Sequence, residues 1–170
     1  MNYLYKFIIT IFFSLILYNP SYSNDKIAFI DIDYLIKNSE IGKKVLLKIN
    51  DLDNKNVNSL KKKDTMLKNL ETEIRNKKNI ISDEAYNKEV ISFREKIVEL
   101  NEEKNNLVKE FNTYKKKELQ NIFDQISPII SNYMDKNSIT IILDSKNIFM
   151  GKVNSNLTKD ILTEIDKELN

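Results

Sequence analysis

Two long stretches of the chain repeat apolar side chains at steps of three, four and seven residues, the spacing that marks one face of an α-helix. The first stretch follows Ser39, which stands at an N-cap position, and runs without proline to Ile81. The pattern restarts at Ser82, a second N-cap candidate followed by two acidic residues. The sequence therefore predicts two helices, the second ending near residues 135–138, joined at a tip near residues 79–84.

The two predicted helices have matching apolar faces and are expected to pack as an antiparallel coiled-coil hairpin. The face of the second helix is more regular, with Lys104 as the exception, whereas Lys63 and Lys77 interrupt the face of the first. Pro128 lies inside the second helix and predicts either a kink or a new first turn capped by Ser127. The predicted seam between the helices consists of Leu60, Leu67, Ile74, Tyr86, Val90, Phe93, Ile97, Leu100, Leu107, Phe111 and Tyr114.

The charge pattern favours the same antiparallel pairing. Residues 61–79 carry seven basic and three acidic side chains, while residues 80–103 carry three basic and seven acidic ones. Folding the chain back at residue 81 or 82 pairs positions whose numbers sum to about 163. This register places basic residues opposite acidic ones, with Lys61, Lys62 and Lys63 facing Glu99, Glu102 and Glu103, and with Lys77 and Lys78 facing Asp83 and Glu84.

The same lysines are candidates for contact with a bound protein or an anionic surface. Runs of like charge on a helix are usually solvated faces, and acidic residues predicted across the hairpin reduce the charge that remains for phosphate groups. The solvated face is therefore the main interpretation. The candidates for contact with a bound protein or an anionic surface are Lys61, Lys62, Lys63, Lys77 and Lys78.

Short apolar runs near the two ends of the chain predict a small β-sheet. The segments 26–32 and 139–144 are rich in β-branched residues, and the segment 148–150, which ends at Gly151, is predicted to form a hairpin with the second strand. A closing amphipathic helix with Thr158 as its N-cap is expected to cover the sheet. The candidate residues of an oligomerisation body are Ile27, Phe29, Ile30, Ile32, Ile139, Ile141, Leu143, Ile148 and Phe149.

The predicted fold class is α+β and mostly α, with a long antiparallel helical hairpin on a small β-sheet base. Residues 39–134 form the hairpin arm, and residues 24–38 and 135–170 form the base. At 1.5 Å per residue the two helices are about 60 and 80 Å long, too long for a globular core to enclose. Because the base is too small to be stable alone and has open sheet edges, we expect it to close into a homo-oligomeric β body.

The first 23 residues have the pattern of a cleavable signal peptide. A basic start is followed by an apolar run from Phe7 to Leu17, which as a helix reaches only about half of a bilayer's hydrocarbon core. Small residues precede a predicted cut between Ser23 and Asn24. The sequence therefore predicts export to the periplasm and cleavage, with a retained N-terminal anchor as the alternative.

The composition argues against most enzymatic chemistry. The chain has neither Cys nor His, which excludes disulfides, Ser-His-Asp and Cys-His relays and the usual zinc ligand sets. Asp31 and Asp33 are a candidate carboxylate pair, but acids at a strand end more often cap the next turn. We expect no catalytic residue, no metal site and no cofactor. The net charge of +2, or +1 without the signal segment, gives no field that would attract nucleic acid.

Four stretches in combination resemble the Skp (OmpH) family of periplasmic chaperones, over essentially the whole mature chain. They are residues 27–44 (IAFIDIDYLIKNSEIGKK), 82–86 (SDEAY), 139–151 and 156–170 (NLTKDILTEIDKELN). The resemblance implies a trimer in which a central β body carries three helical hairpins around a cavity that holds unfolded outer-membrane proteins without ATP. This chain departs from the often basic family in its charge near +1, and Asn156 stands where the family commonly has Asp.

The resulting hypothesis is an ATP-independent holdase for unfolded outer-membrane proteins, with a membrane surface or lipopolysaccharide as a further candidate partner. The alternative from a different class is a structural or adaptor hairpin, a spacer that docks a fixed periplasmic partner along its helices. A holdase binds several unrelated unfolded clients with similar affinity, whereas a spacer is selective. An enzyme is a distant third, because no set of reactive side chains converges in the predicted fold.

Overall fold

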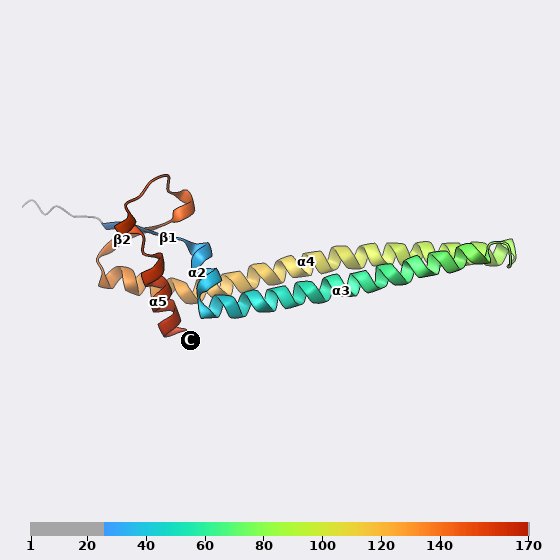
Figure 1. The fold of residues 1–170 in the computed structure, drawn as a ribbon, viewed down its shortest axis with the longest axis horizontal. Helices are drawn as coiled ribbons and strands as arrows, with labels where there is room; N and C mark the ends of the chain where they lie inside the picture. Colours follow the sequence, from blue (N-terminus) through green and yellow to red (C-terminus); the bar gives the residue numbers. More distant parts are fainter. Residues whose placement is uncertain (1–25, 170) are drawn as a thin grey trace, which may run out of the picture.

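A long helical arm projects from a small base in the computed structural model, which describes residues 26–169 (Figure 1). The predicted class, a helical hairpin on a small β-sheet, is confirmed, while the predicted signal peptide lies outside the described residues. The elements follow in the order β1 (Lys26–Ile30), α2 (Ile32–Asn38), α3 (Glu40–Lys77), α4 (Asp83–Lys136), β2 (Ile139–Asp144), the 3₁₀ turns η1 (Ser145–Asn147) and η2 (Val153–Ser155), and α5 (Thr158–Glu168).

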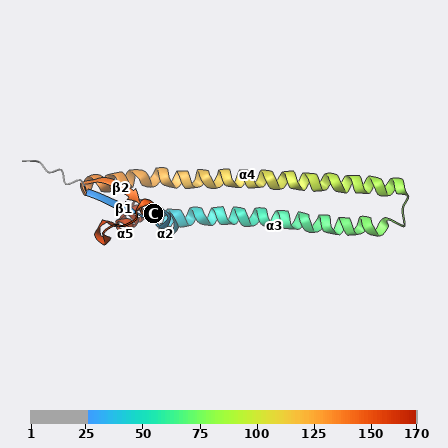
Figure 2. The same cartoon turned by 90° about the horizontal axis from the view of Figure 1, so that it is seen from above.

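The arm consists of α3 and α4, which run antiparallel and side by side (Figures 1 and 2). Their 38 and 54 residues correspond to about 57 and 81 Å of helix. Ser39 Oγ accepts a hydrogen bond from the N–H of Gly42 at 3.2 Å, and Ser82 Oγ accepts one from the N–H of Ala85 at 3.3 Å. Both predicted N-caps are confirmed.

At the tip, the first arm helix is shorter than predicted. The apolar pattern predicted a helix to Ile81, but α3 ends at Lys77 and the chain turns over residues 78–82. The N–H groups of Ile80 and Ile81 both donate to the carbonyl oxygen of Lys77, at 2.8 and 3.1 Å. Because the side chain of Ile80 is 78% exposed, it adds no packing that would extend the helix.

The second arm helix passes through Pro128 without interruption. The predicted new first turn is wrong, because Ser127 Oγ donates to the carbonyl oxygen of Phe123 at 2.6 Å instead of capping a helix; the predicted kink stays a prediction. Proline inside a helix costs about 3 kcal/mol. Ile126 and Ile129, which flank it, are 1% and 5% exposed in the core, and their burial offsets this cost.

The sheet consists of β1 and β2, which pair in parallel with Ile27 opposite Ile141 and Phe29 opposite Leu143. The whole arm forms the connection between these two strands. β1 is shorter than predicted, because Asp31 Oδ1 accepts a hydrogen bond from the N–H of Tyr34 at 2.9 Å and starts α2 there.

The predicted third strand is wrong within the described chain. After β2 the chain forms η1, and the segment Ile148 to Met150 has no strand structure. The side chain of Asp144 caps η1 through the N–H of Lys146 at 3.1 Å, and Lys146 Nζ lies 2.6 Å from Asp33 Oδ2. These contacts direct the chain toward the start of α2, so that it does not fold back on β2.

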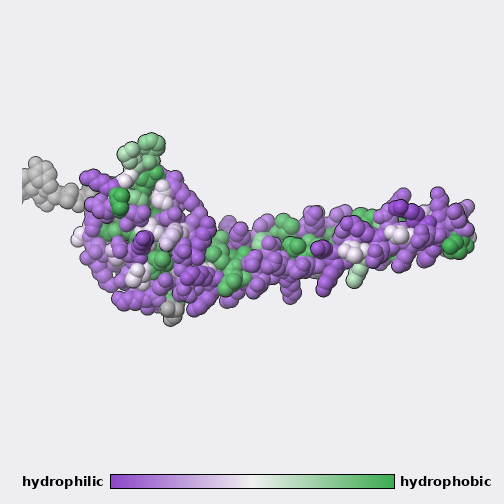
Figure 3. Space-filling model, viewed as in Figure 1, coloured by the Kyte–Doolittle hydropathy of each residue, from purple (hydrophilic) through white to green (hydrophobic). Residues whose placement is uncertain are grey.

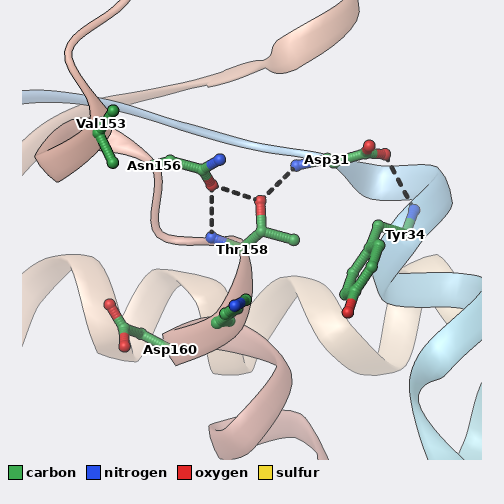
Figure 4. Close-up of a pocket in the computed structure, with 7 residues that line it drawn as sticks. Asp31, Tyr34, Val153, Asn156, Thr158 and Asp160 are labelled. Carbon is green, nitrogen blue, oxygen red and sulfur yellow. Dashed lines mark hydrogen bonds between the residues drawn. The ribbon is translucent and has the colours of Figure 1, made fainter.

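The core of the base lies where α5 packs against α2, α4 and β1. Ile161 and Ile165 of α5 are fully buried. The prediction that Thr158 is an N-cap is wrong, because Leu157 occupies that position and has no side-chain cap. Thr158 Oγ1 instead accepts from the N–H of Asp31 at 2.9 Å and donates to Asn156 Oδ1 at 2.7 Å (Figure 4). Its hydroxyl therefore joins the two ends of the chain within the base.

Candidate functional site

Two ion pairs across the arm define the register of its helices. Lys63 Nζ lies 2.7 Å from Glu103 Oε1, and Lys77 Nζ lies 3.0 Å from Glu89 Oε1. The predicted placement of Lys63 opposite Glu103 is confirmed, and the residue numbers of both pairs sum to 166, slightly above the predicted value near 163. Lys77 meets Glu89 rather than Asp83 or Glu84, so this part of the predicted pairing is wrong.

The predicted seam residues face the partner helix to different extents. Ile74 is buried, with 5% of its surface exposed, whereas Ile97 is 37% exposed. A two-helix arm covers each seam side chain from one side only, which explains why few of them are fully buried. The other predicted seam residues are half-buried: Leu60, Leu67, Tyr86, Val90, Phe93, Leu100, Leu107, Phe111 and Tyr114.

A shallow groove of about 360 Å³ lies in the half of the arm nearer the tip. Its floor is apolar and includes Leu67 and Leu70 of α3 and Leu100 of α4. Its rim is charged, and the Lys63–Glu103 pair stands at one end. The groove offers an apolar surface with a polar border. Figure 3 shows a mostly hydrophilic arm with hydrophobic patches at several places along it.

Exposed apolar side chains outside the seam were missed by the heptad interpretation. We call four of them the outer apolar residues: Met66 of α3 and Ile91, Val98 and Val108 of α4, which are 67%, 55%, 55% and 52% exposed. The sequence could have revealed them, because each is an apolar residue at a helix position outside the predicted seam. Nothing in the described chain covers these side chains, so they are free to contact another protein.

The candidate lysines fall into two groups. Lys63 and Lys77 form ion pairs across the arm while their side chains stay 48% and 45% exposed, whereas Lys61, Lys62 and Lys78 are exposed and form no ion pair across it within residues 26–169. The interhelical pairs occupy seam positions and leave less positive charge for an external anion. The structure therefore separates the lysines by their partners: two are engaged across the arm and three are not.

The candidate residues of the oligomerisation body lie on different surfaces. Ile30 and Ile139 belong to the core and are 3% and 6% exposed. Ile27, Ile141 and Leu143 retain about half of their surface, at 52%, 44% and 43% exposed. The remaining residues of the set are half-buried Phe29, Ile32 and Ile148 and fully exposed Phe149.

The candidate carboxylate pair is divided between two structural roles. Asp31 lines an open pocket of about 500 Å³, and its carboxylate caps α2 through the N–H of Tyr34 (Figure 4). Asp33 pairs with Lys146, and this hydrogen bond holds the pKa of the Asp33 carboxyl below its usual range while raising the pKa of Lys146. The expected capping role of Asp31 is confirmed.

Within residues 26–169, no group of three or more acidic side chains is placed to hold a metal ion. None of the helices in that range combines the length and the apolar character needed to cross a membrane. The surfaces that this part of the chain offers are the arm groove, the outer apolar residues and the exposed side of the base.

Comparison with known proteins finds solved structures of similar fold and a matching family model. The fold matches that of an OmpH-like protein from Caulobacter crescentus, proposed as an outer membrane chaperone, with a TM-score of 0.77 and 15% identity over 85% of this chain and 86% of the other. No curated protein sequence matches the chain. The model of the family described as outer membrane protein (OmpH-like) matches residues 26–165, which include the arm and nearly the whole base. The resemblance seen in the sequence is thereby confirmed, and the chain belongs to the OmpH-like family.

Proposed function

We propose that this protein is an ATP-independent holdase of the periplasm that binds unfolded outer-membrane proteins between its helical arms and prevents their aggregation. The observation that carries the proposal is the arm itself, a mostly hydrophilic rod with an apolar groove, which Met66 also lines, and with the other outer apolar residues on α4. The family and the chaperone assignment of the structural relative support it. No catalysis is part of the proposal.

The proposed binding is weak at each contact and spread over the arm. Covering the exposed half of one aliphatic side chain contributes roughly 1 kcal/mol, so no single contact holds a client. Several such contacts bind an extended chain, yet each can break and re-form without an energy source. An unfolded client held in this way is removed from the pool that aggregates.

The proposal includes a homo-oligomer, a trimer by the family resemblance, because one arm cannot enclose a client. The open apolar surface of the base, with Ile27, Ile141 and Leu143 about half exposed, supports association of copies through the base. Arms that project from a shared base would surround a cavity. The arm groove and the outer apolar residues are the surfaces that such a cavity can use.

Localisation in the periplasm follows from the family and from the predicted signal peptide with its cut between Ser23 and Asn24. A membrane surface or lipopolysaccharide is a second proposed partner. Exposed Lys61, Lys62 and Lys78 support it, whereas Lys63 and Lys77 are engaged across the arm.

The test is an aggregation assay with an unfolded β-barrel membrane protein diluted from urea. The mature protein at stoichiometric amounts should slow aggregation severalfold. Replacing Ile91, Val98 and Val108 together by Ser should remove much of this effect, because these side chains lie outside the seam. The matched control replaces the exposed Asn87, Asn101 and Asn105 of the same helix by Ser and should retain it. Unchanged aggregation in the presence of the unaltered protein would reject the holdase.

The alternative function is that of a spacer that docks one fixed partner along the arm. Two long paired helices are suited to this function as well. Competition between two unrelated unfolded clients separates the two functions. Mutual displacement at similar concentrations supports the holdase, whereas tight binding of one partner that unfolded chains cannot displace supports the spacer.

A further inference from the structure

Charge is distributed unevenly along the arm. The ion pair between Lys63 and Glu103 separates a distal part, residues 61–105, from the part next to the base, which we call the arm root and which comprises residues 43–60 and 106–123. The arm root carries eight basic and four acidic side chains, whereas the distal part carries eleven basic and ten acidic ones. The rest of the described chain has seven basic and ten acidic side chains. The low net charge of the whole chain is therefore the sum of a basic arm root and an acidic base.

The lysines of the arm root have few acidic partners. Within residues 26–169, ion pairs engage five of the eleven basic residues of the distal part, but in the arm root only Lys43, which lies 2.8 Å from Glu40. The other seven are exposed and unpaired in this part of the chain: Lys44, Lys48, Lys55, Lys109, Lys115, Lys116 and Lys117. Because no ion pair engages these seven lysines, their charge remains available to an external anion.

An open groove of about 430 Å³ lies at the arm root between α2 and α4, and we call it the root groove. Its apolar lining consists of Ile36 of α2 and of Leu119 and Phe123 of α4, and Phe123 is 43% exposed. Lys115 and Lys116 line the same groove. Figure 1 shows α2 beside the arm where it meets the base. The root groove therefore combines an accessible apolar surface with two unpaired cations.

This combination fits an anion that carries an apolar group. A run of lysines alone is usually a solvated face, and an inorganic anion would leave the apolar lining uncovered. The volume of the root groove lies at the low end of the range for small-ligand sites, about 300–1,000 Å³, which is room for one or two side chains rather than for the several acyl chains of a membrane lipid. In an extended polypeptide, side chains two positions apart lie on the same face, so an acidic and an aromatic side chain can enter the groove together.

We propose that the root groove binds segments of an unfolded polypeptide in which an acidic residue lies two positions from an aromatic or large aliphatic residue. The apolar side chain covers Phe123 and Ile36, while Lys115 and Lys116 attract the carboxylate. The inference rests on the proposed function and deepens it, because it names the kind of client segment that the arm root selects. Since both lysines are exposed, the attraction is screened over about 8 Å at physiological ionic strength, and the selection depends on salt.

The test compares fluorescently labelled peptides that differ in one kind of side chain. The first peptide repeats Phe and Glu two positions apart in a Ser background, and the second has Gln in place of every Glu. Fluorescence anisotropy with the mature protein should show about fivefold tighter binding of the Glu peptide at low salt. The difference should disappear at about 0.5 M salt, where the screening length is only a few ångströms. Equal affinity for the two peptides at low salt would overturn the proposal.

A pair of matched variants locates the site. Replacing Lys115 and Lys116 together by Gln should remove the preference for the Glu peptide and leave the affinity for the Gln peptide and the circular dichroism unchanged, because both side chains are exposed and unpaired within residues 26–169. The control replaces Lys61 and Lys62 by Gln, the same charge change at two adjacent exposed lysines of the distal part, and should retain the preference. Equal losses in the two variants would show a general effect of charge and contradict the site.

Two further measurements test the occupant. A peptide with Glu but with Ser in place of Phe should bind weakly, and binding as tight as that of the first peptide would exclude a role for the apolar lining. Vesicles of phosphatidylglycerol should bind the Lys115→Gln, Lys116→Gln variant and the unaltered protein alike. If the variant loses vesicle binding but keeps the peptide preference, the surface is a lipid site and the proposal is wrong. A preference for the Glu peptide without suppression of aggregation rejects only the proposed function, whereas suppression without the preference rejects only this inference.

Discussion

Individual polar residues decide how the two ends of the chain meet in the base. Thr158 is 6% exposed, and its hydroxyl both accepts from the N–H of Asp31 and donates to Asn156 Oδ1. A buried polar group is stable only when it is hydrogen-bonded, so this hydroxyl serves two elements that lie far apart in the sequence. Asn156 can take this position because its amide oxygen accepts from both the hydroxyl and the N–H of Thr158.

Thr158→Val should destabilise the protein by about 1–3 kcal/mol, because the N–H of Asp31 loses its acceptor in a partly buried site. The measurement is urea unfolding followed by circular dichroism. Thr163→Val is the matched control, since the hydroxyl of Thr163 is exposed and bonds only to Lys159 within α5. Equal effects of the two substitutions would show that the hydroxyl of Thr158 has no special role.

At the scale of elements, the arm is attached to the base by a tight crossing of α2 and α3. Ser39 separates the two helices, is 1% exposed and caps α3. The N–H of Glu40 donates to Asp166 Oδ1 at 2.8 Å, which ties the start of the arm to α5. A Cβ at Gly42 would lie 1.8 Å from the carbonyl oxygen of Ile36, so only glycine lets the helices approach this closely.

Gly42→Ala should therefore destabilise the base by about 1–3 kcal/mol or more, in spite of the higher helix propensity of alanine. Thermal unfolding should show a lower midpoint. Asn58→Ala, at an exposed position of the same helix, is the control and should be neutral or slightly stabilising. A rise in the midpoint for Gly42→Ala would mean that α2 can move away at little cost.

At the scale of the whole molecule, the arm extends far from a base that contains the only core cluster found in residues 26–169. Most seam residues of the arm stay half-buried, so its stability depends on many shallow contacts and on the ion pairs at Lys63 and Lys77. A rod of this kind is suited to adjusting its surface to varied chains, while the base keeps a fixed structure.

Small-angle scattering combined with light scattering should show a hollow particle with the mass of several chains, three by the family resemblance. The physical reason is the apolar surface left open on the base, which association would cover. Dilution to nanomolar concentration serves as the control for concentration-driven aggregates. An extended particle with the mass of one chain would contradict the proposed cavity and favour the spacer.

The sequence by itself determined the features that depend on local periodicity and capping. Apolar spacing identified both arm helices, and Ser39 and Ser82 marked their first turns, because a cap involves residues only three positions apart. The opposed charges indicated an antiparallel pair. These features are encoded within short stretches of chain, and the structure confirms them.

Only the tertiary structure decided the features that depend on distant partners. Lys77 pairs with Glu89 rather than with Asp83 or Glu84, because the path of the chain through the tip turn decides which acidic residue lies within its reach. Thr158 became a bridge between chain ends because Asp31 supplied a donor from far away in the sequence. Within residues 26–169 the segment around Phe149 forms no strand, because a β-strand needs a neighbouring strand and the ion pair of Lys146 with Asp33 directs this connection away from β2.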